Sequence, residues 1–190
     1  MLKESIFFYI MIDMNILTAI TIICVLSSGI TQARGIKICF EAESAKGIEE
    51  PMCLVSNEVK NISGRVISIP EKAGNPPKLC KGAATYTFDL PKKGSYTLWC
   101  RTWWNGECSN SFTARINDNP PILFGEDATY KAWHWVKYPV SRTSPKINLD
   151  AGKHTLKIEN REDGIMVDQI ILSADKRFVP VDIEKIGTFK

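Results

Sequence analysis

Tryptophan is the residue type whose placement in this 190-residue chain is most informative. All five tryptophans fall in one stretch, at Trp99, Trp103, Trp104, Trp133 and Trp135. An indole ring offers a flat apolar face, which suits the CH faces of a sugar ring when a few polar side chains lie at its rim. Trp104 and Trp133 lie next to loops, which favours contact with a ligand, whereas Trp99 and Trp135 are equally compatible with a place in the core.

Catalytic chemistry is much harder to assemble from this sequence. Neither of the two histidines, His134 and His154, has a serine or cysteine beside it in the arrangement of a nucleophile. Glu162 and Asp163 are adjacent carboxylates in a turn, whereas the paired acids of a glycosidase must approach the substrate from two sides. The formal net charge of +3 is too small to make nucleic acid the expected partner. The sequence therefore predicts that the protein is not an enzyme.

Alternation of apolar and polar residues predicts strands through most of the chain after residue 35. Turn residues such as Pro91 and Gly94 separate the alternating segments, at roughly 8–12-residue spacing. The predicted strands are residues 35–43, 65–69, 83–90, 94–104, 110–117, 132–140, 153–159 and 165–172. Residues 44–64 and 118–131 are expected to be loops without strands. This pattern predicts a single all-β domain, a sandwich or a barrel.

The predicted strand 94–104 places bulky residues on both of its faces, because alternate side chains point in opposite directions. One face carries Tyr96, Leu98, Cys100 and Trp104, and the other carries Trp99, Arg101 and Trp103. Both faces cannot be buried in one core, so we expect a tryptophan of this strand to be partly exposed. The presence of Arg101 and Lys137 near these rings also leaves open an anionic polysaccharide as the ligand.

The N-terminal region predicts export of the protein. Residues 16–30 form an uncharged apolar run, shorter than the roughly 20 residues that span a membrane, and Ala33 closes a small-residue pattern typical of signal-peptidase sites. We interpret residues 1–33 as a cleaved signal peptide, followed by the domain 34–176 and a C-terminal tail, 177–190. An uncleaved membrane anchor is the alternative. The expected location is secreted, periplasmic or at the cell surface.

Cysteine usage fits an oxidising compartment. After residue 33 the chain has Cys39, Cys53, Cys80, Cys100 and Cys108, enough for two disulfides and one free thiol. Cys100 and Cys108 are close enough in sequence to join a hairpin, so this pair is favoured, although the sequence does not fix the pairing. The absence of a CxxC motif or paired histidines argues against a zinc site.

Three motifs, taken in order, resemble a known family of β-sandwiches. The first is Glu41-Ala42-Glu43, and the second is segment 94–99, Gly-Ser-Tyr-Thr-Leu-Trp, with Arg101 after it. The third is segment 152–158, Gly-Lys-His-Thr-Leu-Lys-Ile, followed by residues 167–172, Val-Asp-Gln-Ile-Ile-Leu. Across residues 37–175 this order resembles the galactose-binding-like jelly rolls of carbohydrate-binding module families 6 and 35. The resemblance implies a jelly-roll β-sandwich, a structural calcium ion, and a sugar site formed by loops at one edge.

The resemblance further implies that Glu41, Glu43 and Asp168 bind the calcium ion, with a backbone carbonyl near Arg65. Calcium takes roughly six to eight oxygen ligands, and glutamates two apart on a strand project from the same face. Asp168 lies among apolar residues of its predicted strand, where a carboxylate needs a cationic partner or a metal. The alternative is that Asp168 pairs with a nearby arginine or lysine, without any metal.

The resemblance and the tryptophans together imply a sugar site. Arg161 and Asp163 lie in the loop before the last predicted strand, where the family often places polar contacts, and Asn110 begins another strand. Residues 44–64 contain no aromatic side chain, so holding the sugar between two rings would need Tyr130 or Trp103 instead. The expected sugar contacts are Trp103, Trp104, Asn110, Trp133, Arg161 and Asp163.

The expected function is non-catalytic binding of a polysaccharide by an exported, calcium-stabilised β-sandwich. The alternative is a protein-interaction or surface-assembly module that uses the same fold without a sugar ligand, since fold alone does not determine function. A concave cleft at the tryptophans favours a sugar, and a flat apolar patch favours a protein partner. Nucleic acid is not an expected partner, and a membrane is expected only if residues 1–33 are retained.

Overall fold

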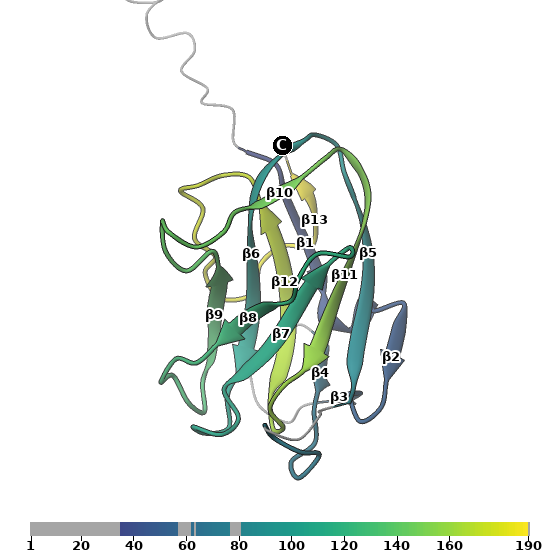
Figure 1. Cartoon of the computed structure of the whole chain (residues 1–190), viewed down its shortest axis with the longest axis vertical. Coiled ribbons are helices and arrows are strands. Elements are labelled where there is room, and N and C mark those ends of the chain that lie inside the picture. Colours follow the sequence, from purple (N-terminus) through teal and green to yellow (C-terminus); the bar gives the residue numbers. More distant parts are fainter. Residues whose placement is uncertain (1–34, 57–61, 63, 77–80, 190) are drawn as a thin grey trace, which may run out of the picture. The chain divides into compact units, whose positions relative to one another are not determined.

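The computed structural model describes residues 35–56, 62, 64–76 and 81–189, which fold into two antiparallel β-sheets packed face to face (Figure 1). The predicted all-β sandwich is confirmed. The expected signal segment, residues 1–33, lies outside the described residues. Within the described ranges, no helix has the length and hydropathy to cross a membrane.

Within the described residues, the larger sheet has eight strands. Its central order is β10 (Ile147–Leu149), β6 (Gly94–Trp103), β12 (Met166–Ser173), β1 (Lys37–Glu41) and β13 (Gly187–Phe189). The strand β4 (Arg65–Ser68) pairs with β12 and with β3 (Cys53–Ser56), and β9 (Trp133–Tyr138) pairs with β6. One edge of β6 is therefore paired with β12, and the other edge with β10 and then β9.

The smaller sheet, in the part of the chain that the structure describes, has five strands, in the order β2 (Gly47–Glu49), β5 (Ala83–Leu90), β11 (Gly152–Asn160), β7 (Ser111–Ile116) and β8 (Ile122–Gly125). A short 3-10 helix, η1 (Ala42–Ser44), follows β1. Because of this helix, β1 ends at Glu41, two residues before the end of the predicted strand 35–43.

Short strands are where prediction and structure differ. The strands β2 and β3 fall within residues 44–64, and β8 falls within residues 118–131, so the expectation that both ranges lack strands is wrong. The C-terminal tail, 177–190, contains the short strand β13, which pairs with β1. Strands of three or four residues are too short to show an alternating pattern, and they form because their backbones pair with longer neighbours.

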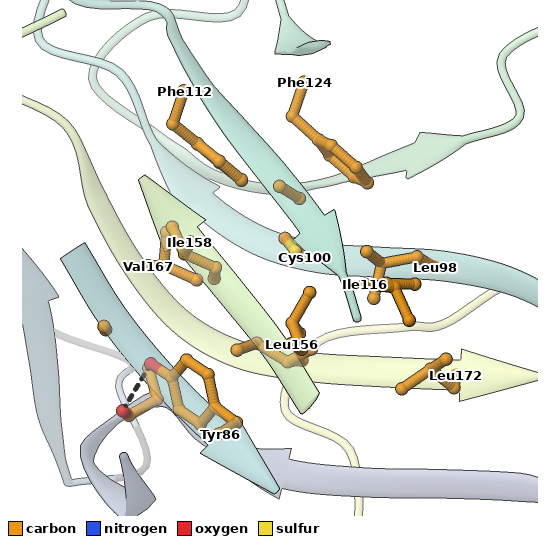
Figure 2. Close-up of a cluster of buried hydrophobic side chains, with 14 of the residues drawn as sticks. Tyr86, Leu98, Cys100, Phe112, Ile116, Phe124, Leu156, Ile158, Val167 and Leu172 are labelled. Carbon is orange, nitrogen blue, oxygen red and sulfur yellow. Dashed lines mark hydrogen bonds between the residues drawn. The ribbon is translucent and has the colours of Figure 1, made fainter. Parts of the chain in front are cut away.

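The main core fills the space between the sheets (Figure 2). Leu98 and Cys100 of β6 are fully buried there, together with Phe112 and Leu156 of the smaller sheet. Tyr86 is also buried, and its hydroxyl donates a hydrogen bond to the Ala42 carbonyl oxygen at 2.7 Å, so its polar end is satisfied. Each large apolar side chain buried in this way contributes about 1.5–3 kcal/mol. This core fixes which face of β6 points outward.

A second, smaller cluster lies on the outer face of the larger sheet, which is the face directed away from the main core. Its buried members are Cys39, Trp99 and Ile171, and Trp135 and Phe178 pack against them. Phe178 belongs to the C-terminal segment, residues 174–186, which runs from the end of β12 to β13 (Figure 1). The two faces of β6 thus belong to two different clusters, and the C-terminal segment covers part of the outer one.

The C-terminal segment is attached to the sheet through Glu184. The Gln169 side chain of β12 accepts a hydrogen bond from the Glu184 amide at 2.8 Å and donates one to the Glu184 carbonyl oxygen at 2.9 Å. The Glu184 carboxylate forms an ion pair with Lys37 of β1 at 2.9 Å. The Lys37 ammonium lies 4.8 Å from the ring centre of Phe178. These contacts make the segment an ordered part of the sandwich.

Candidate functional site

Beyond the cover of the C-terminal segment, the outer face presents a pair of indole rings. Trp103 of β6 and Trp133 of β9 are direct cross-strand neighbours, with ring centres 5.8 Å apart and ring planes inclined by 58°. Both side chains are half-buried, so each keeps part of its ring exposed. Two expected site residues, from distant parts of the sequence, therefore meet on one surface.

Two cations lie among the aromatic rings of the two strands that carry this pair. The register of β6 and β9 places Arg101 opposite Trp135 and Trp99 opposite Lys137. The Lys137 ammonium lies 5.3 Å from the centre of the Trp99 ring, and the Arg101 guanidinium lies 5.2 Å from the centre of the Trp133 ring. A cation at this distance from an indole face is attracted by the ring's quadrupole. We call these five residues, together with Trp103, the outer ladder.

The C-terminal segment closes one part of the outer ladder. Trp135 donates a hydrogen bond from Nε1 to the Asp182 carbonyl oxygen at 2.9 Å, and Phe178 packs against the cluster that contains Trp99. Trp99 and Trp135, which the sequence left undecided, are thus held by the protein itself. The exposed aromatic surface is the end of the ladder at Trp103 and Trp133.

Trp104 is not part of that surface. Its side chain is fully buried, and it packs against Phe112 and the edge of His134, with ring centres 6.0 and 5.7 Å away. Its Nε1 donates a hydrogen bond to Asp127 at 3.1 Å, and its carbonyl oxygen accepts one from the Lys131 amide at 2.8 Å. The expectation that Trp104 offers its ring to a sugar is wrong, because residues 126–132 close over it and place it in the main core.

Asp127 anchors this closure. It accepts hydrogen bonds from the Trp104 indole and the Thr129 amide, and His134 Nε2 lies 3.2 Å from its carboxylate. Burial acts to raise the pKa of Asp127, but the hydrogen bonds and the neighbouring His134 more than offset it, so its pKa lies below the ordinary value of 3.8. Sequence reasoning missed this residue, since a single aspartate in a loop carries no recognisable signal.

Asn110 and Arg161 connect loops at one end of the sandwich. The Asn110 side-chain amide donates to the Asp127 carbonyl oxygen at 3.0 Å, and the Asn110 backbone amide donates to Glu162 Oε2 at 3.0 Å. Arg161 forms ion pairs with Glu126 at 3.0 Å and Glu162 at 2.9 Å. Asn110 is buried and Arg161 is half-buried. Both are close to one another through Glu162, but their polar atoms are engaged with the protein.

Asp163 has a similar structural role in a neighbouring loop. It is buried, and its carboxylate accepts hydrogen bonds from the Gly74 amide at 3.0 Å and the Asn75 side chain at 3.4 Å. The Asp163 amide donates to Asn75 Oδ1 at 2.8 Å. The structure therefore separates the expected sugar contacts into an exposed pair, Trp103 and Trp133, and a set that holds loops together.

The three expected calcium ligands have separate surroundings. Asp168 is fully buried and forms an ion pair with the equally buried Arg101, with 2.6 Å between Oδ2 and Nη1. Glu41 accepts a hydrogen bond from the Gln169 side chain at 3.3 Å. Glu43 accepts one from the Arg65 amide at 3.1 Å through Oε1, while its Oε2 is buried and makes no hydrogen bond to the described chain. Among the described residues, no group of three acids, histidines or cysteines is close enough to hold a metal.

The described cysteines are free thiols. Cys39, Cys53, Cys100 and Cys108 form no disulfide, and Cys80 lies outside the described residues. The favoured pair of Cys100 and Cys108 is wrong, because Cys100 is fully buried between the sheets while Cys108 is exposed in the loop after β6. Burial, with a smaller contribution from Glu41, raises the pKa of Cys39 to about 12.

Comparison with known proteins gives structural matches. No family model and no curated protein matches this sequence. The C-terminal family 6 carbohydrate-binding module of a marine laminarinase from Zobellia galactanivorans matches with a TM-score of 0.50 and 16% identity, over 72% of this chain and 98% of that one. A family 35 carbohydrate-binding module from Clostridium thermocellum matches with a TM-score of 0.50 and 16% identity, over 72% of this chain and 96% of that one. The chain has the fold of these modules.

The same fold occurs as one part of larger enzymes. An exo-β-1,3-galactanase from Phanerochaete chrysosporium matches with a TM-score of 0.52 and 19% identity over 74% of this chain, and the match spans 29% of the enzyme. The galactose-binding-like fold predicted from the three motifs is therefore confirmed. At these identities the likeness concerns the fold, and the function has to be argued from the surface of this chain.

Proposed function

We propose that the domain binds a polysaccharide without catalysis and that the Trp103–Trp133 pair is its platform. The observation that carries this proposal is the meeting of two half-buried indoles on one face of the larger sheet. Sugar rings pack their CH faces on such rings, and a platform that is fixed before binding loses little conformational entropy. Protein neighbours that match this chain over nearly their whole length are named as carbohydrate-binding modules.

The buried donor of Trp133 adds support. Its Nε1 is buried and has no hydrogen-bond partner within the described chain. An unsatisfied buried donor costs about 1–3 kcal/mol. A ligand hydroxyl that accepts from this N–H would recover that cost. Trp99 Nε1 is likewise buried without a hydrogen-bond partner in the described chain, but Phe178 of the C-terminal segment packs against the cluster that contains it.

The carboxylates near the platform's end of the sandwich argue for binding rather than hydrolysis. Glu126 and Glu162 form ion pairs with Arg161, and Asp163 is hydrogen-bonded to Gly74 and Asn75. A glycosidase needs two carboxyl groups that face the scissile bond, one of them as a proton donor. Carboxylates committed to a guanidinium and to loop amides are poorly suited to that task.

The test is binding of the full chain to a panel of neutral and acidic polysaccharides, followed by tryptophan fluorescence and by affinity gel electrophoresis. Trp103→Ala and Trp133→Ala should each weaken binding by at least about tenfold, the loss of one ring contact worth 1.4 kcal/mol. The control is Leu123→Ala, which removes a 41% exposed apolar side chain from β8 of the other sheet. Wild-type affinity in both tryptophan variants would overturn the proposed platform.

A protein partner is the second candidate, and the C-terminal segment favours it. Val179, Val181, Ile183 and Ile186 expose 64%, 70%, 41% and 44% of their surface, respectively. Exposed aliphatic side chains gathered in one segment are typical of interaction surfaces. Failure of every polysaccharide in the panel would direct attention to this segment.

Export and calcium binding belong to the same proposal. Export and removal of residues 1–33 rest on the sequence pattern of that segment. Calcium is supported by Glu43, whose buried Oε2 makes no hydrogen bond to the described residues and is the kind of oxygen that calcium prefers. The Arg101–Asp168 ion pair counts against a ligand role for Asp168, because it already neutralises that carboxylate.

A further inference from the structure

A hollow of about 140 Å³ lies at the other end of β6 from the Trp103–Trp133 platform. It is lined by Ser95 and Thr97 of β6, by the loop between β9 and β10, and by the residues at and after the end of β12. Ser95 and Thr97 alternate with the buried Tyr96 and Leu98, as Trp99, Arg101 and Trp103 do further along, so they share the outer face. We call this hollow the basic pocket.

Three cationic side chains give the pocket its name. Arg142 and Lys146 come from the loop between β9 and β10, and Lys176 comes from the C-terminal segment. All three are exposed residues, and within the described chain none of them forms an ion pair. Among the residues that the structure describes, no aspartate or glutamate lines the pocket. Uncompensated charges of one sign in a concave site raise the local concentration of an oppositely charged ligand.

Hydroxyl groups complete the chemistry. Ser141 Oγ lies 2.9 Å from Thr143 Oγ1 and 3.1 Å from Ser144 Oγ, and the Ser144 hydroxyl also accepts the Ser141 amide at 3.2 Å. This arrangement folds the loop back on itself and holds its hydroxyls and cations at the pocket. Hydroxyl and cationic donors together, without a competing acid, match the acceptor oxygens of a sulfate or carboxylate group.

Asp175 is next to Lys176 in the sequence, but it does not line the pocket because it takes part in the turn after β12. Its carboxylate accepts a hydrogen bond from the Arg177 amide at 2.9 Å, and its own amide donates to Ser173 Oγ at 3.1 Å. Asp175 therefore stabilises the turn after β12 and brings Lys176 to the pocket.

We propose that the basic pocket binds the anionic group, a sulfate ester or a carboxylate, of the polysaccharide whose sugar rings rest on Trp103 and Trp133. This inference rests on the proposed function. Ser95 and Trp103 lie eight residues apart on one strand, which at roughly 3.4 Å per residue places them about 27 Å apart. A chain of several sugar units is needed to reach both sites, and the exposed Lys137 lies between them on β9. The ligand class is thus an acidic polysaccharide rather than a short neutral sugar.

Nucleic acid would also be attracted by three cations, but the surroundings favour a polysaccharide. The formal net charge is only +3, and the pocket is a small hollow rather than an extended basic groove. A nucleic-acid site of several phosphates needs a continuous row of cations along the backbone. Single-stranded oligonucleotide is therefore included in the test as a competing ligand.

The test compares matched polymers on the full chain. Dextran sulfate is compared with dextran, and polygalacturonate with its methyl ester, so that only the anionic group changes. The pocket variant is Lys146→Gln with Lys176→Gln. The control is Lys92→Gln with Lys153→Gln, which removes the same charge from exposed lysines elsewhere on the sandwich. Arg142→Gln provides a second, independent pocket variant, and thermal unfolding confirms that each variant is folded.

Wild type should bind one acidic polymer at least about tenfold more tightly than its neutral counterpart, and the preferred polymer identifies the group as sulfate or carboxylate. The pocket variant should lose most of that preference and show a smaller dependence on salt, since fewer counterions are released. Its affinity for the neutral polymer and all affinities of the control should be unchanged. Equal losses in pocket and control variants would overturn the inference, as would a stronger preference for the oligonucleotide, or inorganic sulfate binding without any polymer preference.

The outcomes also separate this inference from the proposed function. Neutral polymers bound through Trp103 and Trp133, with no gain from charge, would overturn the basic pocket and leave the platform in place. Binding of no polymer at all, neutral or acidic, would overturn both.

Discussion

The guanidinium of Arg101 and the carboxylate of Asp168 lie 2.6 Å apart, and both side chains are almost entirely buried. This ion pair joins β6 to β12 next to the irregular register between Val167 and Gln169. The same guanidinium lies 5.2 Å from the Trp133 ring centre, on the surface that carries the proposed platform. One interaction therefore neutralises the buried carboxylate and supports the ring that is proposed to bind sugar.

Arg101→Met should destabilise the fold strongly. The substitution removes the Arg101 guanidinium from the buried Asp168 carboxylate, and breaking a buried ion pair typically costs about 3–5 kcal/mol. The double variant Arg101→Met with Asp168→Leu should recover most of the loss, because no buried charge is left unpaired. Urea unfolding of the two variants measures both effects. A single variant within about 1 kcal/mol of wild type would show that the pair is not buried in solution.

Phe178→Ala should loosen the cover over the outer cluster. Phe178 is half-buried against the cluster that contains Cys39 and Trp99, so its loss should cost about 1–2 kcal/mol, less than a fully buried ring. Since burial is the main reason that the pKa of Cys39 is raised to about 12, the thiol should also become more reactive.

Alkylation of the native protein, with the modified cysteine located by peptide mass spectrometry, measures this reactivity. Val179→Ala is the matched control, because it shortens the neighbouring side chain, which is 64% exposed. Unchanged alkylation of Cys39 in the Phe178 variant would mean that the C-terminal segment is not what protects it.

Calcium should stabilise the protein through Glu43. Chelation is expected to lower the melting temperature, and added calcium to restore it, since a ligand at 100 times its Kd contributes about 2.7 kcal/mol. At 2–4 °C per kcal/mol this is a shift of about 5–11 °C. Glu43→Gln should abolish the response to chelation, whereas Glu50→Gln, at an exposed position before β3, should retain it. A wild-type melting temperature that is insensitive to chelator would remove calcium from the proposal.

The residue pattern predicted the long central strands well because these strands alternate over many residues. Strand β5 has the predicted ends at Ala83 and Leu90, and β6 places Trp99 and Trp103 on the face opposite Leu98, as its alternation implies. Which of those tryptophans is exposed depends on the C-terminal segment and Phe178, which no local pattern connects to β6. The alternation within a single strand does not predict tertiary contacts of this kind.

The candidate site was predicted only in part, again because tertiary contacts decide which residues meet. Trp103 and Trp133 come together because the register of β6 with β9 makes them neighbours, and a register between strands thirty residues apart is not readable from either strand. Trp104 and Asp163 looked like ligand contacts because loop residues often are. Their burial follows from how several loops pack against each other, in which Asp127 and Asn75 supply the hydrogen bonds.

Acid should weaken the closure of residues 126–132 over Trp104. The pKa of Asp127 in the folded protein lies below its ordinary value of 3.8, despite the opposing effect of burial, because hydrogen bonds and His134 favour the carboxylate. A group with a depressed folded pKa contributes stability that is present above its unfolded pKa and is lost as the pH falls through the folded one. The contribution of Asp127 should therefore be complete above about pH 5 and be lost progressively as the pH falls below about 3.8 and through the lower folded pKa.

Asp127→Asn isolates that contribution. The amide oxygen can still accept the Trp104 hydrogen bond, so the substitution removes mainly the negative charge. The variant should therefore be less stable than wild type at neutral pH, and the difference should shrink as the pH falls below 3.8. Urea unfolding at several pH values gives the difference directly. Asp89→Asn, an exposed substitution on β5, serves as the control for general acid effects. A stability difference that stays constant from neutral pH into acid would show that Asp127 acts through packing and not through its charge.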